Sequence, residues 1–345
     1  MDIGIGLDAS LRLSFEDEAE MAHEAAKLGY TSIWTPETTG RDSFQVCAHR
    51  WRASQREIPT GLTTGISVVP VMYRSPVALA MSGGTLSELT GGKFVLGIGA
   101  GSVYQSASRL SMGLPDISAL SMMRDYLTTL RLLLSGEKLD YRGEVVTLTD
   151  VRLGIRPPQR TPIYLGSLGP KMLKLAGELA DGAALNWCTP QQRIWSKERI
   201  AEGAASAGRD PSKIKTVEYI RICIDDDVEL ARKAFTKSLM PYALGARVPT
   251  TRERRMGYRA HFERIGFSDT LKEIDKLRVD GAPRSEIVEA FPPELLLSVG
   301  YYGKPEGASK ALAALTHGLD TAIVRVVSAR PSLESVRAVM KACKP

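Results

Sequence analysis

Eight short apolar segments recur along this chain, each followed by polar or glycine-rich residues and usually by a helical pattern. Apolar runs of this length, bounded by turn residues, are typical of buried strands. Strands that alternate with helices predict an α/β fold with a parallel sheet, and eight units favour a closed (β/α)8 TIM barrel over an open doubly wound sheet. The expected strands are residues 3–7, 32–35, 64–69, 94–98, 162–165, 183–185, 216–224 and 321–327.

Residues 64–101 define one strand–helix–strand unit in detail. The first strand is β-branched, and Ser75 and Pro76 are suited to the N-cap and first position of the helix that follows. The pair Gly91-Gly92 is expected to end this helix. The second strand leads into Gly99-Ala100-Gly101, so glycine stands where the strand meets a ligand-binding face.

Two insertions interrupt the regular alternation within a single predicted barrel domain over residues 1–345. Residues 139–153 alternate polar and apolar side chains around Arg142-Gly143, which predicts a β-hairpin before the fifth barrel strand. Residues 242–303 predict a partly helical insert before the last strand, with six arginines between Arg247 and Arg264. Long inserts in barrels are usually lids or interfaces, so these arginines are expected to line a dimer face or to neutralise an anionic ligand.

Composition excludes several classes of protein. The chain of 345 residues is 43% hydrophobic and 24% charged, and it has neither a signal-peptide pattern nor a long apolar run. A cytoplasmic globular protein with no membrane partner is therefore expected. The four cysteines are far apart and show no CxxC spacing, which argues against disulfides and structural zinc. They are Cys47, Cys188, Cys223 and Cys343.

The formal net charge of +6 favours anionic partners. Nucleic acid is not expected, because aromatic residues make up only 6% of the chain and no basic run is interleaved with them. An anionic small molecule suits the composition better.

The turn after the fifth strand is the strongest candidate for a phosphate site. Its residues Gly166-Ser167-Leu168-Gly169-Pro170-Lys171 lead directly into a helix. Free backbone N–H groups, the Ser167 hydroxyl and the helix dipole converge there, and Lys171 adds a positive charge. The alternative is an ordinary loop, since glycine is common in such turns.

The Gly99-Ala100-Gly101 turn lets backbone approach a flat ring or a phosphate closely, although a plain tight turn would also need glycine. It lacks the third glycine of the dinucleotide-binding fingerprint and lies in the wrong unit for it. A Rossmann-type site is therefore not predicted.

Protein side chains alone offer little chemistry. No histidine pair has metal-ligand spacing and no GxSxG elbow is present, so we expect no metal and no serine nucleophile. An organic cofactor is then required, with a side chain supplying at most one proton. The candidates for that proton are Glu37, Asp42, His49, Ser102 and Tyr104.

Four segments resemble the bacterial luciferase-like superfamily, and within it the coenzyme F420 (deazaflavin)-dependent oxidoreductases such as methylenetetrahydromethanopterin reductase. They are residues 32–37, 67–76, 85–101 and 162–171. The resemblance covers residues 2–225 well and 304–329 loosely. It implies a (β/α)8 barrel, in agreement with the strand count.

The resemblance also implies a bulge with a non-prolyl cis peptide in the third strand, at Ile66-Ser67 or one bond later. This bulge presses against the cofactor ring in the family. Carried over by motif, the residues that contact the deazaflavin are Ile66, Ser67, Val68, Gly99, Ala100 and Gly101, and those on its phosphate side are Gly166, Ser167, Gly169 and Lys171.

Several relatives place a glutamate just after the glycine turn as proton donor or acceptor, whereas this chain has Ser102. The implied catalytic residues are therefore Glu37, Ser102 and Tyr104. The resemblance implies hydride transfer between F420 and a small organic substrate, and a homodimer or larger homo-oligomer. The alternatives are an FMN-dependent monooxygenase that uses oxygen and a non-catalytic flavin-binding protein.

Overall fold

The computed structural model describes residues 1–345 except 102–109, 112, 114–116, 156, 158 and 252. Eight parallel strands close into a barrel, because β11 pairs with both β1 and β9, and β9 also pairs with β8. In order around the barrel they are β1 (Asp2–Gly6), β2 (Ser32–Thr35), β3 (Thr63–Pro70), β4 (Phe94–Gly99), β7 (Ile163–Gly166), β8 (Gly182–Asn186), β9 (Lys215–Ile224) and β11 (Thr321–Val327).

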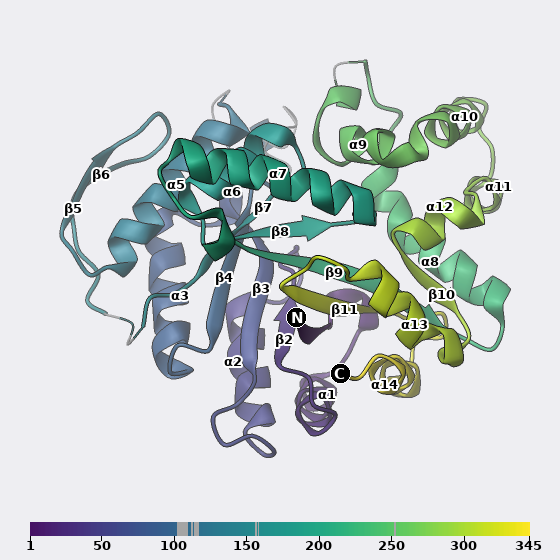
Figure 1. Ribbon diagram of the computed structural model, residues 1–345, viewed down its shortest axis with the longest axis horizontal. Coiled ribbons are helices and arrows are strands. Elements are labelled where there is room, and N and C mark those ends of the chain that lie inside the picture. Colours follow the sequence, from purple (N-terminus) through teal and green to yellow (C-terminus); the bar gives the residue numbers. More distant parts are fainter. Residues whose placement is uncertain (102–109, 112, 114–116, 156, 158, 252) are drawn as a thin grey trace.

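The TIM barrel predicted from the sequence is thus confirmed. Each of the eight expected strands is present, and its ends lie within one residue of the expected ones. Helices cover the outside of the barrel (Figure 1). Those that connect barrel strands or close the chain are α1 (Phe15–Lys27), α2 (Ser43–Ser54), α3 (Pro76–Leu89), α5 (Ala119–Leu134), α6 (Pro170–Leu179), α7 (Pro190–Ser206), α8 (Val228–Ala243), α13 (Pro305–Leu315) and α14 (Leu333–Ala342).

Local signals set the helix ends as expected. The Ser75 hydroxyl accepts a hydrogen bond from the backbone N–H of Ala78 at the start of α3, and Pro76 takes the first helical position. After this helix, Gly91 and Gly92 adopt φ angles of +62° and +85°. Glycine permits this left-handed turn, which directs the chain into β4.

Both predicted insertions are present. Strands β5 (Leu139–Arg142) and β6 (Thr147–Val151) form an antiparallel hairpin. The second insertion contains α9 (Gly257–Phe262), α10 (Ser268–Val279), α11 (Arg284–Glu289) and α12 (Pro293–Ser298). It ends in a strand that the sequence did not predict, β10 (Gly300–Gly303), which pairs with the end of β9 beyond the residues that β8 contacts. The hairpin and the insert lie at opposite ends of the long axis (Figure 1).

Buried apolar side chains form three clusters, one of which packs α8 against the second insertion and includes Phe235, Phe262 and Phe291. Apolar side chains between the strands and the outer helices form the large outer layer. A smaller cluster fills the barrel itself and consists of Trp34, Val95, Ala184, Val217, Tyr219 and Ile323. Above this filled interior, the carboxyl ends of the strands form the mouth of the barrel.

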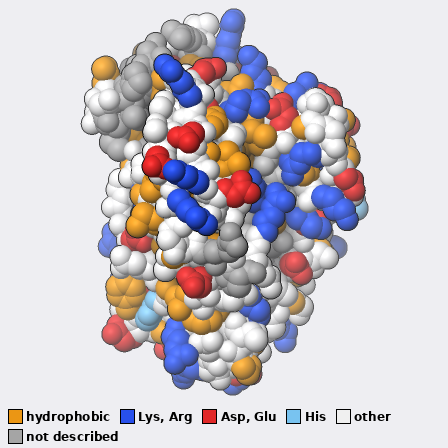
Figure 2. Space-filling view, turned by 90° about the vertical axis from the view of Figure 1, so that its left-hand side faces the viewer, with side chains coloured by type: hydrophobic (Ala, Val, Ile, Leu, Met, Phe, Trp, Pro, Cys, Tyr) orange, Lys and Arg blue, Asp and Glu red, His pale blue; other side chains and the backbone are white. Residues whose placement is uncertain are grey.

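The surface carries charge of both signs. On the face that includes the β5–β6 hairpin, Lys and Arg side chains lie among acidic and apolar ones (Figure 2). Within the residues that the structure describes, no helix combines the length and apolar character needed to cross a membrane.

Candidate active site

The mouth of the barrel has two chemically different halves. Tyr219 on β9 and Ile323 on β11 belong to the cluster inside the barrel, and the side chains two residues further along each strand point the same way. Arg221 and Arg325 therefore reach the mouth, and they are neighbours in the β9–β11 ladder. On β4 and β7 the equivalent positions are glycines, so that half of the mouth consists of main chain.

Strand β3 carries the bulge that the family resemblance implies. The peptide bond between Ser67 and Val68 is cis, and the register of β3 against β4 shifts between Ile66 and Val69. This is the second of the two expected positions. Ser67 and Val68 are half-buried, whereas the Ile66 side chain is buried in the outer core layer.

Three glycines accommodate this bulge. A Cβ atom on Gly97 would lie 2.1 Å from the carbonyl oxygen of Ile66, and one on Gly99 would lie 2.5 Å from Cγ2 of Val68. On Gly166 it would lie 3.3 Å from Cγ1 of the same valine. Because any side chain at the first two positions would displace the bulge, the glycines keep this half of the mouth flat.

The predicted phosphate loop joins β7 to α6. Ser167 is buried, and its hydroxyl lies 3.1 Å from the Leu165 carbonyl oxygen and 3.3 Å from that of Met172, so it fixes the turn. Gly169 is the N-cap residue of α6, and a Cβ atom on it would meet nothing within 4 Å. Lys171 is exposed in the first turn of the helix. The loop thus presents a helix N-terminus beside the flat half of the mouth.

The arginine-rich insert adds a cation to this loop. Arg264 donates from Nη2 to the carbonyl oxygen of Leu168 at 2.8 Å and from Nε to Oε1 of Gln192 at 3.3 Å. Its guanidinium lies 4.8 Å from the ring centroid of Trp195. Burial lowers the pKa of Arg264. The sequence shows the arginine run but does not distinguish Arg264 within it.

Glu37, a predicted proton donor or acceptor, is buried and already partnered. Its carboxylate forms an ion pair with Arg74 and accepts a hydrogen bond from the Ser43 hydroxyl. Arg74 also binds Asp42 at 2.6 Å, and Asp42 caps α2. Both carboxylates therefore hold the loop after β2 in place, and the catalytic role of Glu37 stays a prediction.

Among the other predicted residues, Ala100 and Gly101 follow β4 directly at the rim of the mouth. Ala100 is half-buried and Gly101 is exposed, with a φ of +57°. Ser102 and Tyr104 lie outside the described residues. His49 is held on the outside by Phe15, whose carbonyl oxygen is 2.7 Å from Nε2 of the histidine.

The charged half of the mouth was missed by sequence reasoning. Arg325 donates from Nε to Oδ2 of Asp8 at 2.6 Å, and Arg221 donates from Nη1 to Oδ1 of Asn186 at 2.6 Å. Tyr242, near the end of α8, lies against both guanidinium groups. A signal was present, because each arginine stands two residues after an inward-facing residue, Tyr219 or Ile323, on the same strand.

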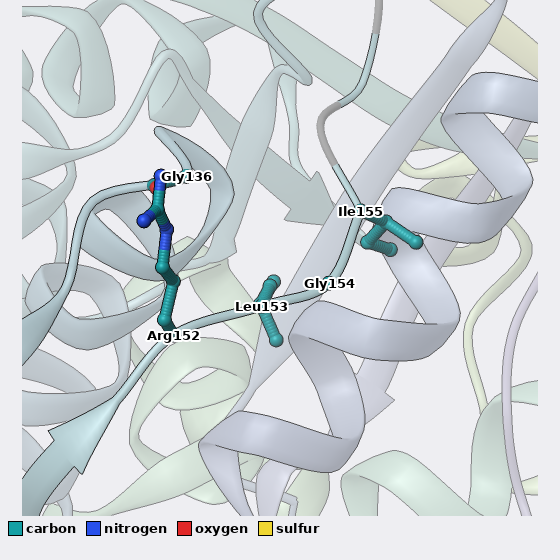
Figure 3. A pocket seen from close by; sticks show the side chains of 5 residues that line it. All are labelled: Gly136, Arg152, Leu153, Gly154 and Ile155. Carbon is teal, nitrogen blue, oxygen red and sulfur yellow. The ribbon is translucent and has the colours of Figure 1, made fainter.

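Two hollows lie outside the glycine-lined half. One of about 340 Å³ opens at the ends of β1 and β2, where Asp8, Thr35, Pro36 and Arg41 are among its lining residues. The other, of about 510 Å³, lies by the β5–β6 hairpin, where Arg152 extends toward Gly136 and donates to its carbonyl oxygen at 3.1 Å (Figure 3). Because the hairpin leads into the amino end of β7, this second hollow lies toward the end of the barrel opposite the mouth.

Comparison with known proteins shows which family the sequence of this chain matches. The sequence model described as "Luciferase-like monooxygenase" matches residues 3–321. A 5,10-methylenetetrahydromethanopterin reductase from Archaeoglobus fulgidus is 35% identical over 190 residues, which are 55% of this chain and 56% of that protein. The alignment thus spans little more than half of the length of that reductase.

Two further comparisons cover more of the chain. An F420-dependent glucose-6-phosphate dehydrogenase from Mycolicibacterium smegmatis is 26% identical over 320 residues, 86% of this chain and 90% of that protein. The solved structure of an F420-dependent secondary alcohol dehydrogenase with an F420-acetone adduct superposes with a TM-score of 0.76 at 18% identity. It covers 100% of this chain and 99% of that one.

Proposed function

Since this chain belongs to the luciferase-like monooxygenase family, we propose that it is a coenzyme F420-dependent oxidoreductase, which transfers hydride between the deazaflavin and a small organic substrate. The observation that carries the proposal is the flat, glycine-lined half of the barrel mouth beside a helix N-terminus. F420, when bound, supplies a two-electron hydride donor or acceptor.

The residues present fit such a cofactor. A planar ring needs a flat surface, and Gly99 and Gly166 add no side chain of their own beside the half-buried Val68 bulge. A phosphate needs N–H donors and positive charge, which the start of α6 provides at Gly169 with Lys171 nearby. Arg264, from the insert, places a second positive charge at the same loop. This charge favours binding of an anionic cofactor tail.

Cofactor choice is tested by binding. We expect purified protein, titrated separately with F420 and with FMN, to bind F420 tightly and FMN at least about tenfold more weakly, a difference of about 1.4 kcal/mol. Fluorescence of each cofactor reports the binding. An Arg264→Gln variant should weaken F420 more than FMN, because F420 carries the longer anionic tail.

The opposite preference supports the alternative function. Tight binding of FMN without binding of F420 would indicate a flavin-dependent monooxygenase on the same barrel, since a phosphate loop of this type suits either cofactor. Tight F420 binding without any hydride transfer would indicate a non-catalytic carrier.

A further inference from the structure

The side chain of Tyr242 lies against two cations at the mouth of the barrel. Arg325 donates from Nη1 to the phenol oxygen at 3.3 Å, and the Arg221 guanidinium carbon is 5.1 Å from the centroid of the phenol ring. The tyrosine itself is half-buried. A polar oxygen is thus held by positive charge at the edge of the mouth.

Arg221 has no counter-ion within the part of the chain that the structure describes. Its side chain is 1% exposed, and its Nη2 has no hydrogen-bond partner there, whereas Arg325 is bound to Asp8. A buried charge is costly unless an opposite charge or a hydrogen-bond acceptor offsets it. The charged half of the mouth therefore holds a buried guanidinium group whose positive charge no carboxylate of the described residues offsets.

Trp187 fixes Arg221 in this position. Its ring lies 3.6 Å from the guanidinium carbon of Arg221, and its backbone adopts a φ of +56°, which is unusual for a side chain of this size. The Trp187 carbonyl oxygen is 2.8 Å from Nε2 of His261. An unfavourable backbone conformation held by the surrounding structure is typical of functional sites.

Charged and titratable groups lie around the phenol of Tyr242 on three elements. They are Arg221 on β9, Arg325 on β11 and Tyr258 on α9 at a ring-centroid distance of 4.8 Å. Asp8, after β1, binds Arg325 on its other side. Burial raises the pKa of this phenol, but the two guanidinium groups outweigh burial and lower it to about 8. A group with a pKa near the working pH transfers protons efficiently.

The strand order places this cluster across the mouth from the cofactor half. Strands β9 and β11 lie opposite β3 and β4 in the closed barrel, so a substrate between them would meet the ring on one side and Tyr242 on the other. We propose that Tyr242 is a catalytic residue that exchanges a proton with the oxygen on the reacting carbon of the substrate, while Arg221 and Arg325 stabilise the negative charge. The substrate class is a small carbonyl compound or the corresponding alcohol, and this inference rests on the proposed function.

The proposed step is balanced. In the reducing direction, hydride from reduced F420 forms a C–H bond at the carbonyl carbon, and the π electron pair of the C=O bond moves to oxygen. That oxygen takes the proton of the Tyr242 hydroxyl. The phenolate left beside the two guanidinium groups is protonated from water, and F420 is left oxidised.

The first test follows phenol ionisation in the cofactor-free protein. We expect one tyrosine to ionise near pH 8 in ultraviolet difference spectra, and this transition should disappear in Tyr242→Phe. It should persist in Tyr301→Phe, whose hydroxyl donates to the Lys304 carbonyl oxygen and whose pKa is raised by burial. A wild-type protein without this transition, or a Tyr242→Phe variant that keeps it, would overturn the proposal.

Thermal denaturation gives a second readout with a defined sign. A pKa lower in the folded state than the ordinary value of 10 means that ionised Tyr242 stabilises the fold above that ordinary value. This contribution is lost as the pH falls through about 8. The difference in Tm between wild type and Tyr242→Phe should therefore move in favour of the wild type as the pH is raised from about 8 to 10. A difference in Tm that stays constant over this range would count against the proposal.

Access from the cofactor side is tested by chemical modification. Tetranitromethane, which attacks phenolates, should nitrate Tyr242, and saturating F420 should slow this reaction at least about tenfold. Peptide mass spectrometry locates the nitrated residue. Nitration of Tyr242 at the same rate with and without bound F420 would show that this side chain does not face the cofactor.

Catalysis is tested with a panel of small ketones and aldehydes as oxidants of reduced F420. Tyr242→Phe should lower kcat about 10²–10⁴-fold and leave F420 affinity unchanged, and wild-type reduction should slow as the pH rises above about 8. Equal kcat values for the two proteins, or no oxidation by any of these compounds, would overturn the inference. Failure of F420 to bind would instead overturn the proposed function.

Discussion

Gly169→Val should abolish F420 binding and leave the fold intact. The φ and ψ of Gly169 are −89° and 157°, which valine adopts readily, and a Cβ atom at this position meets nothing within 4 Å. The isopropyl group would instead fill the space above the start of α6, where the cofactor phosphate is proposed to lie. Loss of two charge-assisted hydrogen bonds, at about 1.5–3 kcal/mol each, corresponds to a loss of affinity of about 100-fold or more.

Fluorescence titration with F420 measures this effect, and circular dichroism and Tm check the fold. Gly154→Val is a matched control, because Gly154 also has open space around its Cβ position but lies in the hollow by the β5–β6 hairpin. The control variant should bind F420 like the wild type. An F420 affinity that Gly169→Val leaves unchanged would show that the cofactor phosphate does not bind at this loop.

Arg193→Leu should cause a large loss of stability. Arg193 and Glu218 are each 1% exposed, and Nε of the arginine lies 2.7 Å from Oε2 of the glutamate. The second carboxylate oxygen accepts from the backbone N–H of Cys188 at 2.7 Å. Without the arginine a buried carboxylate loses its counter-ion, which costs about 3–5 kcal/mol and is measured by urea and thermal denaturation.

The pH dependence of this loss has a definite sign. Burial already raises the pKa of Glu218, and removal of Arg193 removes the largest influence that lowers it. A carboxyl pKa that is raised in the folded state favours folding at low pH, and this advantage is lost as the pH rises through the folded-state value. The deficit of Arg193→Leu should therefore shrink toward acidic pH.

A double variant separates charge from packing. Arg193→Leu combined with Glu218→Gln removes both charges, so it should recover part of the stability that Arg193→Leu loses at neutral pH. Arg160→Leu removes an exposed arginine from Asp181 and should have little effect. A neutral-pH loss below about 1 kcal/mol in Arg193→Leu would contradict an essential role for this buried pair.

The fold was predictable because its signals are local and repeated. Runs such as Phe94–Gly99 mark strands wherever they occur, and Ser75 with Pro76 marks a helix start without knowledge of the tertiary structure. Strand β10 was not predicted, because its sequence Gly-Tyr-Tyr-Gly carries little strand signal. Its pairing with β9 is a tertiary contact that the pattern does not encode.

The candidate site was predictable only in its main-chain half. Gly99 and Gly169 stand out because each lies where a predicted strand or turn leads to the expected ligand-binding face, although an ordinary turn would also accept glycine there. Arg221, Tyr242 and Arg325 become neighbours only when the barrel closes, since they belong to β9, α8 and β11. Pairings between side chains so far apart in the sequence depend on strand register, which no local pattern defines.

A crystal structure of the protein with F420 tests the central claim most directly. We predict the deazaflavin ring against the Val68 bulge and the Gly99 main chain, with its phosphate at the start of α6 and the opposite face of the ring toward Tyr242. Density that places the ring elsewhere, or a mouth filled by side chains of the protein itself, would contradict this account.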